Sequence, residues 1–244
     1  MFSYFIENFS LKRESKLDNF LNKKIVPSFF VKNIQFFRAI SCGCPVFMES
    51  KKNFKFDKRA ESYDDGFEGK VSQKFYDLVI KNVVVSNEMN VLDVGCGTGT
   101  ILYQLKEMYS FNGYGIDVEE KMLEQARLKC PDMDIRLCSC DDTPFNEDQF
   151  DIIIACMAYH HFPDKDSFSR ETARILKKGG ILYIADPKLP LPIRKVLNRA
   201  LDIHKINGRI FTSNEVADNF SNFGFECVFD KSDVYAQIIC LKKI

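Results

Sequence analysis

Glycines and carboxylates in the first half of the chain have the types and spacing of a nucleoside-binding site. The segment VLDVGCGTG (91–99) leads an apolar run into Gly95, Gly97 and Gly99. Glycines permit a tight turn and let a ligand approach the backbone closely. The free N–H groups of the helix expected after this turn can hold a carboxylate or a phosphate. Asp117, about 20 residues further on, can accept hydrogen bonds from both ribose hydroxyls of a nucleoside.

The spacing of these glycines separates two classes of cofactor. A dinucleotide fingerprint requires G-x-G-x-x-G, whereas this loop reads G-x-G-x-G and is followed by Thr100. Asp93 also lies inside the strand, two residues before the first glycine. A carboxylate there is unfavourable beside a pyrophosphate, but it suits a ligand that carries an ammonium and a sulfonium group. The pattern therefore favours a sulfonium nucleoside, with a nicotinamide dinucleotide as the rival.

A second group of polar side chains follows the apolar run FDIIIAC (150–156). Tyr159, His160 and His161 come directly after it, and open α/β sheets bind ligands at the carboxyl ends of their strands. A histidine at such a position can remove a proton from a substrate. Histidines in this kind of loop also serve local packing, so a catalytic and a structural role both stay open for His160 and His161.

Alternating strand and helix patterns position both groups of residues. We expect strands over 91–94, 114–117, 134–138, 150–156, 181–186, 225–231 and 235–243. We expect helices over roughly 70–85, 98–109, 119–129, 164–177 and 192–206, and another that begins at a Thr-Ser-Asn cap and ends at Gly224. This rhythm predicts an α/β fold with a doubly wound, mostly parallel sheet and helices on both faces. The last two strands are close enough in sequence to pair antiparallel.

Four segments resemble motifs of the class I S-adenosylmethionine-dependent methyltransferases. VLDVGCGTG resembles the first motif of that family, and GIDVEEKMLEQA (115–126) resembles the second. PFNEDQFDIIIACMAYHHFPD (144–164) is similar to the fourth-strand region, and RILKKGGILYIADP (174–187) to the hairpin of the fifth strand. The most similar subgroup contains the ubiquinone and menaquinone C-methyltransferases and many small-molecule enzymes. The resemblance covers about residues 54–244 and implies a Rossmann-like, seven-stranded sheet whose last strand is antiparallel.

The resemblance also implies which residues bind S-adenosylmethionine. Asp93, Gly95 and Gly97 would hold its amino-acid end, Asp117 its ribose, and Tyr63 would close over the methionine part. The full set of expected cofactor contacts is Tyr63, Asp93, Gly95, Cys96, Gly97, Asp117, Val118, Met122, Ser139, Cys140, Asp141 and Cys156.

One departure from the family pattern concerns the adenine. Val118 and Met122 would flank this ring. Members of the family usually have an aspartate six residues before the Phe of a Pro-Phe pair, where it binds the adenine amino group. That position is Ser139 in this chain. Either Ser139 makes the contact with backbone help from Cys140, or the loop shifts and Asp141 makes it.

Methyl transfer from a sulfonium is a direct displacement, which requires alignment of nucleophile, methyl and sulfur. We therefore expect a methyltransferase that acts on a small molecule with Tyr159, His160 and His161 as candidate catalytic residues and without a metal. The acceptor, and whether a carbon, oxygen or nitrogen atom is methylated, cannot be read from the sequence. The alternative is a non-catalytic S-adenosylmethionine-binding regulatory or partner protein.

The connector after the fifth strand is expected to form a lid over the substrate. It has one acidic residue, Asp202, and six basic ones: Lys188, Arg194, Lys195, Arg199, Lys205 and Arg209. These charges fit a solvated helix face, an anionic or lipid-like acceptor, or an anionic membrane surface.

Composition limits the remaining possibilities. The 244 residues have a formal net charge of zero, which gives no reason to expect a nucleic-acid partner. No apolar run approaches the length of about 20 residues that a membrane span needs, and no signal peptide is recognisable. The nine cysteines lack C-x-x-C spacing and fall mainly in strand-like runs. Reduced cysteines of this kind fit a reducing compartment, so we expect a cytoplasmic protein.

Residues 1–47 lie outside the resemblance. They carry seven basic and three acidic residues, paired phenylalanines and no strand pattern. Three explanations stay open: a helical appendage, a basic and aromatic element that touches a membrane or a lipid-like substrate, or an over-long reading whose true start is Met48. We expect residues 48–244 to form the methyltransferase domain, and 1–47 a helical or poorly ordered extension.

Overall fold

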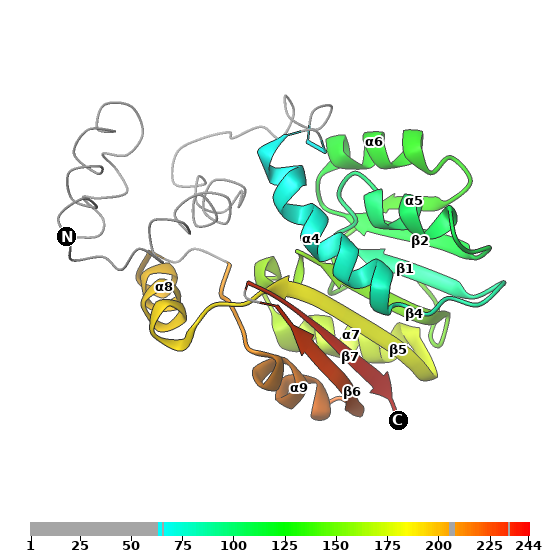
Figure 1. Ribbon diagram of the computed structural model, residues 1–244. Coiled ribbons are helices and arrows are strands. Elements are labelled where there is room, and N and C mark those ends of the chain that lie inside the picture. The colour runs from blue at the N-terminus through cyan, green and yellow to red at the C-terminus, as the bar shows by residue number, and fades with distance from the viewer. Residues whose placement is uncertain (1–62, 65, 205–207, 234) are drawn as a thin grey trace. The chain divides into compact units, whose positions relative to one another are not determined.

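A computed structural model describes residues 63–244, apart from residues 65, 205–207 and 234 (Figure 1). The predictions for residues 1–47 and for a domain start at residue 48 lie outside these residues. What the structure describes is one α/β sheet with its flanking helices, so it bears directly on the predicted fold and on the predicted site.

The sheet has seven strands in the order β3-β2-β1-β4-β5-β7-β6. Strands β1 to β5 pair parallel, whereas β7 runs antiparallel to both β5 and β6. The predicted seven-stranded, mostly parallel sheet with an antiparallel last strand is therefore confirmed. The strands are β1 (Asn90–Val94), β2 (Asn112–Asp117), β3 (Asp134–Leu137), β4 (Phe150–Cys156), β5 (Leu176–Pro187), β6 (Phe225–Ser232) and β7 (Ala236–Lys243).

Helices connect these strands, and all six predicted helices are present. They are α4 (Phe67–Asn82), α5 (Thr100–Lys106), α6 (Glu120–Lys129), α7 (Lys165–Ile175), α8 (Leu191–His204) and α9 (Ser213–Ser221), with a short 3-10 turn η4 (Tyr159–His161). In the described part of the chain, none of them has the length and hydropathy that a bilayer crossing requires.

The two faces of the sheet bury different helices, and β4 shows why. This strand is buried on both sides, so its side chains alternate between two cores. Ile152 and Ile154 pack with α4 and α5, which include Phe75 and Ile101. Ile153 packs instead with α7 and α9. Figure 1 shows α4 crossing in front of the sheet, where it contacts β4, β5 and β7.

Several predicted helix ends were wrong by a few residues, and the backbone conformation explains two of them. The helix predicted over 98–109 begins only at Thr100, because Gly99 has φ of 75° and lies outside the helical region. The helix predicted over 164–177 ends at Ile175, and β5 begins at once with Leu176. Gly179 does not stop the helix; its φ of 80° lies inside the strand, near a register shift against β4.

The helix predicted after the Thr-Ser-Asn segment is confirmed, together with its cap. Thr212 Oγ1 accepts a hydrogen bond from the backbone N–H of Glu215 at 3.2 Å. Glu215 Oε2 in turn accepts from the backbone N–H of Thr212 at 2.7 Å. This reciprocal capping box fixes where α9 begins.

Candidate functional site

The glycine loop lies between β1 and α5, and its backbone conformation explains its sequence. Gly95, Gly97 and Gly99 all have positive φ, at 74°, 51° and 75°. A Cβ on Gly95 would lie 2.7 Å from the Cβ of Ala158, which is too close. A Cβ on Gly97 would meet nothing within 4 Å, so this position borders open space. The loop can therefore admit a ligand close to the backbone of Gly97.

Asp117 ties this loop to the end of β2. Its Oδ2 accepts a hydrogen bond from the N–H of Gly97 at 2.9 Å, and its Oδ1 accepts from the N–H of Glu119 at 3.0 Å. Burial raises the pKa of Asp117, although these backbone N–H groups act in the opposite direction. A carboxylate has about four lone-pair sites, so two remain for hydroxyl groups of a ligand.

Asp93 is a buried carboxyl group with an unsatisfied oxygen. Its side chain lies on β1, 2% exposed, and Oδ1 has no hydrogen-bond partner among the described residues. Burial, and then the nearby charge of Asp117, raises the pKa of Asp93 from 3.8 to about 8. A buried acceptor without a donor costs free energy unless a ligand supplies one. Asp93 beside the glycine loop therefore fits the cationic end of S-adenosylmethionine.

The residues predicted to surround the adenine lie after β2 and β3. Met122 is buried on α6, whereas Val118 is 66% exposed at the end of β2. Ser139 Oγ donates a hydrogen bond to Asp141 Oδ1, and Cys140 between them is buried. Ser139 and Asp141, the two candidates for the adenine contact, thus lie in one loop and are joined by this hydrogen bond.

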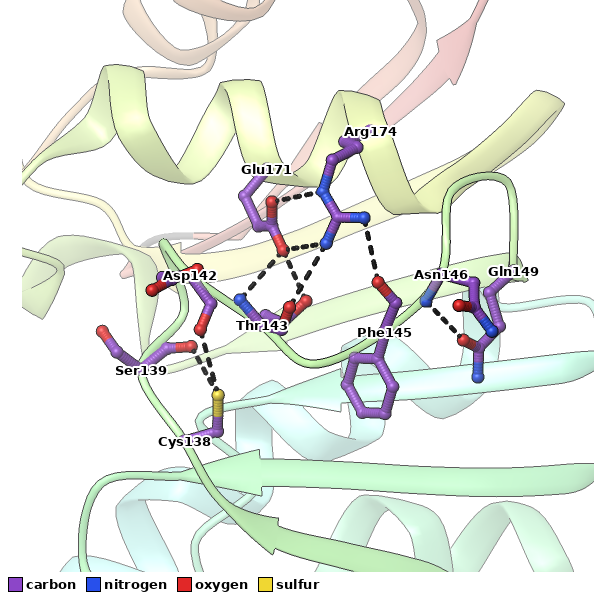
Figure 2. A network of polar contacts seen from close by, with 9 residues as sticks. All are labelled: Cys138, Ser139, Asp142, Thr143, Phe145, Asn146, Gln149, Glu171 and Arg174. Carbon is purple, nitrogen blue, oxygen red and sulfur yellow. Dashed lines mark hydrogen bonds and ion pairs between the residues drawn. The ribbon is translucent and has the colours of Figure 1, made fainter.

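A network that the sequence did not suggest holds this loop against α7 (Figure 2). Glu171 Oε1 accepts hydrogen bonds from the backbone N–H of Thr143 at 3.0 Å and from its hydroxyl at 2.5 Å. Arg174 donates to both Glu171 oxygens, at 2.8 and 2.7 Å, and to the carbonyl of Phe145 at 2.9 Å. Burial alone would raise the pKa of Glu171, but these donors hold it below its usual value. The loop that carries Ser139 is therefore fixed from outside the cofactor site.

Tyr63 is followed by Asp64, which binds the residues at the start of α5. Asp64 accepts hydrogen bonds from the hydroxyls of Thr98 at 2.9 Å and Thr100 at 3.1 Å. It also forms an ion pair with Lys129, at the end of α6. Tyr63 is half-buried. Sequence reasoning suggested a role for Tyr63 but not for Asp64, because Asp64 is 34 to 65 positions away in sequence from Thr98 and Lys129.

Cys96 and Cys156, two of the predicted cofactor contacts, are buried. Cys96 is 7% and Cys156 6% exposed. Burial raises the pKa of both thiols, and the charge of Asp93 acts on each in the same direction. Both cysteines are therefore neutral neighbours of Asp93.

His160 forms a buried pair with Asp186, at the carboxyl ends of β4 and β5. The backbone N–H of His160 donates to Asp186 Oδ2 at 2.8 Å, and Nδ1 lies 2.9 Å from Oδ1. Because a carboxylate only accepts hydrogen bonds, Nδ1 carries the proton and Nε2 keeps its lone pair. The sequence missed Asp186, although its place at the end of the run ILYIAD, beside β4 in a parallel sheet, was a usable signal.

The other two candidates differ in their surroundings. The His161 ring stacks on His160 with centroids 3.9 Å apart. Burial holds the pKa of His161 well below 6.5, and the charge of Lys165 acts in the same direction. Tyr159 is 1% exposed and packs against Phe168 and Phe220 in the core. Of the three candidates, Tyr159 is therefore the one with a clear packing role.

Three of the six basic residues of the predicted lid have partners in the structure. Arg194 pairs with Glu215 and Arg209 with Asp202, while Lys188 donates to Ser232 at 2.6 Å. Lys195 and Arg199 are exposed on α8, and Lys205 lies outside the described residues. The excess of positive charge is thus smaller than the sequence suggested.

The segment that contains the glycine loop and Asp117 is similar to known proteins. A family model described as a methyltransferase domain matches residues 92–184, from β1 to β5. The chain carries a methyltransferase domain. The predicted likeness to S-adenosylmethionine-dependent methyltransferases is confirmed over these residues, and S-adenosylmethionine is the cofactor of this class of domain.

Relatives of the methyltransferase domain act on quinones, according to their names. The 2-methyl-6-phytyl-1,4-hydroquinone methyltransferase of Synechocystis is 38% identical over 100 residues, which are 39% of this chain and 31% of that protein. The demethylmenaquinone methyltransferase of Chlorobaculum parvum is 30% identical over 118 residues, 48% of this chain and 49% of that protein. The chain thus spans about a third to a half of the length of these relatives.

A solved structure shares the fold of the methyltransferase domain at low identity. Geranyl diphosphate C-methyltransferase from Streptomyces coelicolor superposes with a TM-score of 0.61 and 11% identity, over 79% of this chain and 82% of that one. That crystal contains S-adenosyl-L-homocysteine. The family match includes the glycine loop, Asp117 and His160 but ends before Asp186, α8 and α9.

Proposed function

We propose that this chain transfers a methyl group from S-adenosylmethionine to a small-molecule acceptor by direct displacement. The observation that carries the proposal is the unpartnered Oδ1 of Asp93, buried beside a glycine loop that borders open space at Gly97. A buried carboxyl group without a donor is costly in a domain that binds no cation. It is explained where the ligand brings an ammonium and a sulfonium group.

Each end of the cofactor has a matching set of residues. Asp93 and the N–H groups of the glycine loop would hold the amino-acid part, and Asp117 would accept from the ribose hydroxyls. Met122 and the loop of Ser139 and Asp141 would enclose the adenine. Bound in this way, the cofactor supplies an electrophilic methyl group on sulfur. The task of the protein is then to align the acceptor with that methyl group.

His160 is the residue we propose for proton removal from the acceptor. Its pairing with Asp186 fixes the tautomer in which Nε2 can accept a proton. The pair lies at the carboxyl ends of β4 and β5, where ligands of open α/β sheets bind. The names of the quinone-methylating relatives support a small organic acceptor. A cytoplasmic location remains our prediction from the reduced cysteines.

The proposal is tested by transfer of a labelled methyl group. The protein would be incubated with methyl-labelled S-adenosylmethionine and a small-molecule extract, and the labelled product identified by mass. We expect one product whose mass exceeds that of its precursor by one methylene. Binding of the cofactor without any labelled product would contradict the proposal and favour a regulatory cofactor-binding protein.

A further inference from the structure

Lys165 places an ammonium group next to the candidate site without a counter-ion. It is the first residue of α7 and is half-buried. Its Nζ donates to the carbonyl of Phe162 and lies 5.1 Å from the ring centroid of Tyr159 and 5.4 Å from that of Phe211. Among the described residues, no carboxylate lies within ion-pair distance of this nitrogen.

Two features make this position unfavourable for a positive charge. Partial burial disfavours the charged form and lowers the pKa of Lys165 to about 8. The first turn of a helix carries the positive end of its dipole, which repels a cation. The two aromatic rings and the Phe162 carbonyl compensate in part, since ring faces and carbonyl oxygens attract a cation. A half-buried ammonium group whose direct partners in the described structure are all neutral can accept an anionic ligand.

The carboxylates nearest to Lys165 are engaged elsewhere. Asp186 is bound through both oxygens to His160. Asp164 caps α7 and accepts from the backbone of Asp166 and Ser167. A second cation, Arg209, lies 5.9 Å from the Phe211 ring, but it has Asp202 as a partner. The charges of Asp186 and Asp164 act to raise the pKa of Lys165. Neither carboxylate lies within ion-pair distance of Nζ, so an anionic ligand could supply a direct partner.

The position of Lys165 connects it with the cofactor loop. The carbonyl that accepts its hydrogen bond belongs to Phe162, whose ring would lie 4.0 Å from a Cβ on Gly95. Lys165 therefore lies one residue away from the glycine loop and close to the His160–Asp186 pair. The proposed function places both the methyl donor and the base beside this region.

We infer that Lys165 forms an anion subsite for the methyl acceptor, which accordingly carries an anionic oxygen such as a carboxylate or phenolate. The inference rests on the proposed function, because that function places the acceptor between the glycine loop and His160. The ammonium would donate a charge-assisted hydrogen bond to this oxygen. The rings of Phe162 and Phe211 would border the apolar body of the acceptor.

The test uses a pair of small probes that differ in charge and little in shape. Benzoate and benzamide would be titrated into the full chain saturated with S-adenosylhomocysteine, with binding followed by NMR. We expect benzoate to bind about tenfold more tightly than benzamide, because only the carboxylate carries the negative charge that pairs with the ammonium group. Lys165→Met should abolish this preference, and Lys165→Arg should retain it.

A matched control and a measurement without mutation complete the experiment. Lys178→Met removes an exposed lysine of β5 and should leave the preference unchanged. In the unmodified protein, benzoate should slow the reaction of Lys165 with trinitrobenzenesulfonate, read by peptide mass mapping. Equal binding of the two probes, a preference that survives Lys165→Met, or unprotected Lys165 would each overturn the inference. Failure of S-adenosylhomocysteine to bind would instead overturn the proposed function itself.

Discussion

Asp93 gives cofactor binding a distinct dependence on pH. Its pKa is raised to about 8, by burial and then by the charge of Asp117. The ammonium of the cofactor binds the ionised carboxylate, so binding below pH 8 must release a proton. Affinity for S-adenosylhomocysteine should therefore rise about tenfold per pH unit from pH 6 to 8 and then level off. Calorimetry in buffers of different ionisation enthalpy measures both the affinity and the released proton.

Asp93→Asn is the control for this prediction. The variant keeps the shape of the side chain but cannot ionise, so its weaker affinity should lose most of the pH dependence. The pKa of Asp117 is also raised, and the slope left in Asp93→Asn reports that second group. A flat affinity profile in the unmodified protein would show that Asp93 does not hold the cationic end of the cofactor.

His160 and Asp186 are expected to act as one unit in catalysis. His160→Ala should lower the turnover rate by about 10²–10⁴ at unchanged cofactor affinity, because it removes the proposed base. Asp186→Asn should also slow turnover, since an amide cannot accept from both N–H groups of His160 through two oxygens. Turnover would be measured with the acceptor that the labelling screen identifies.

The outcome separates catalysis from packing. If His160→Ala lowered the turnover rate by less than about threefold, the loss would be far below that expected for a general base. His160 would then have a structural role. Tyr159→Phe provides the comparison, because Tyr159 lies in the core and should lose little turnover.

Candidate site residues could be recognised where their chemistry lies within one short segment. The glycines with Asp93 and the following Asp117 were recognisable because strand, turn and strand end are close in sequence. Asp186 and Lys165 were missed because their roles arise from neighbours that the sheet and α7 bring together. The distance in sequence from His160 to Asp186 is 26 residues, and nothing in the spacing fixes that pair.

At the scale of elements, α7 supports the cofactor site from outside. Glu171→Gln should weaken both the fold and cofactor binding, because Gln cannot satisfy Arg174 and both donors of Thr143. We expect a loss of about 1–3 kcal/mol in the free energy of unfolding and a several-fold weaker affinity for S-adenosylhomocysteine. Chemical denaturation measures the first effect and calorimetry the second.

The matched control is Glu147→Gln, which neutralises an exposed glutamate of the same loop. It should change neither quantity measurably. If Glu171→Gln destabilised the fold but left cofactor affinity intact, the network would be structural only.

Elements were easier to predict than their ends. The alternating strand and helix pattern identified all seven strands. The clearest were buried parallel strands such as β4, which form continuous apolar runs. The start of α5 depended on the positive φ of Gly99, and the end of α7 on the extended backbone of Leu176, which sequence pattern does not reveal. The same limit applies to the loop of Ser139, whose position depends on contacts with α7.

At the scale of the whole molecule, residues 1–47 should be dispensable for fold and cofactor binding. All strands of the sheet lie after Met48, and a domain of about 195 residues is ample for an independent core. Truncation to Met48 should leave the melting temperature and the affinity for S-adenosylhomocysteine close to those of the full chain. An insoluble product, or a melting point lower by more than about 8 °C, would show that the segment is part of the core.

The central claim is that the glycine loop, Asp93 and Asp117 bind S-adenosylmethionine, and calorimetric titration with S-adenosylhomocysteine tests it most directly. We predict saturable binding at one site, no binding of NADH, and a loss of at least about 100-fold in Asp117→Ala, since two charge-assisted hydrogen bonds of roughly 1.5–3 kcal/mol each disappear. Asp132→Ala, which removes an exposed carboxylate, should bind like the unmodified chain. Unchanged affinity in a folded Asp117→Ala protein, or preferential binding of NADH, would contradict the account.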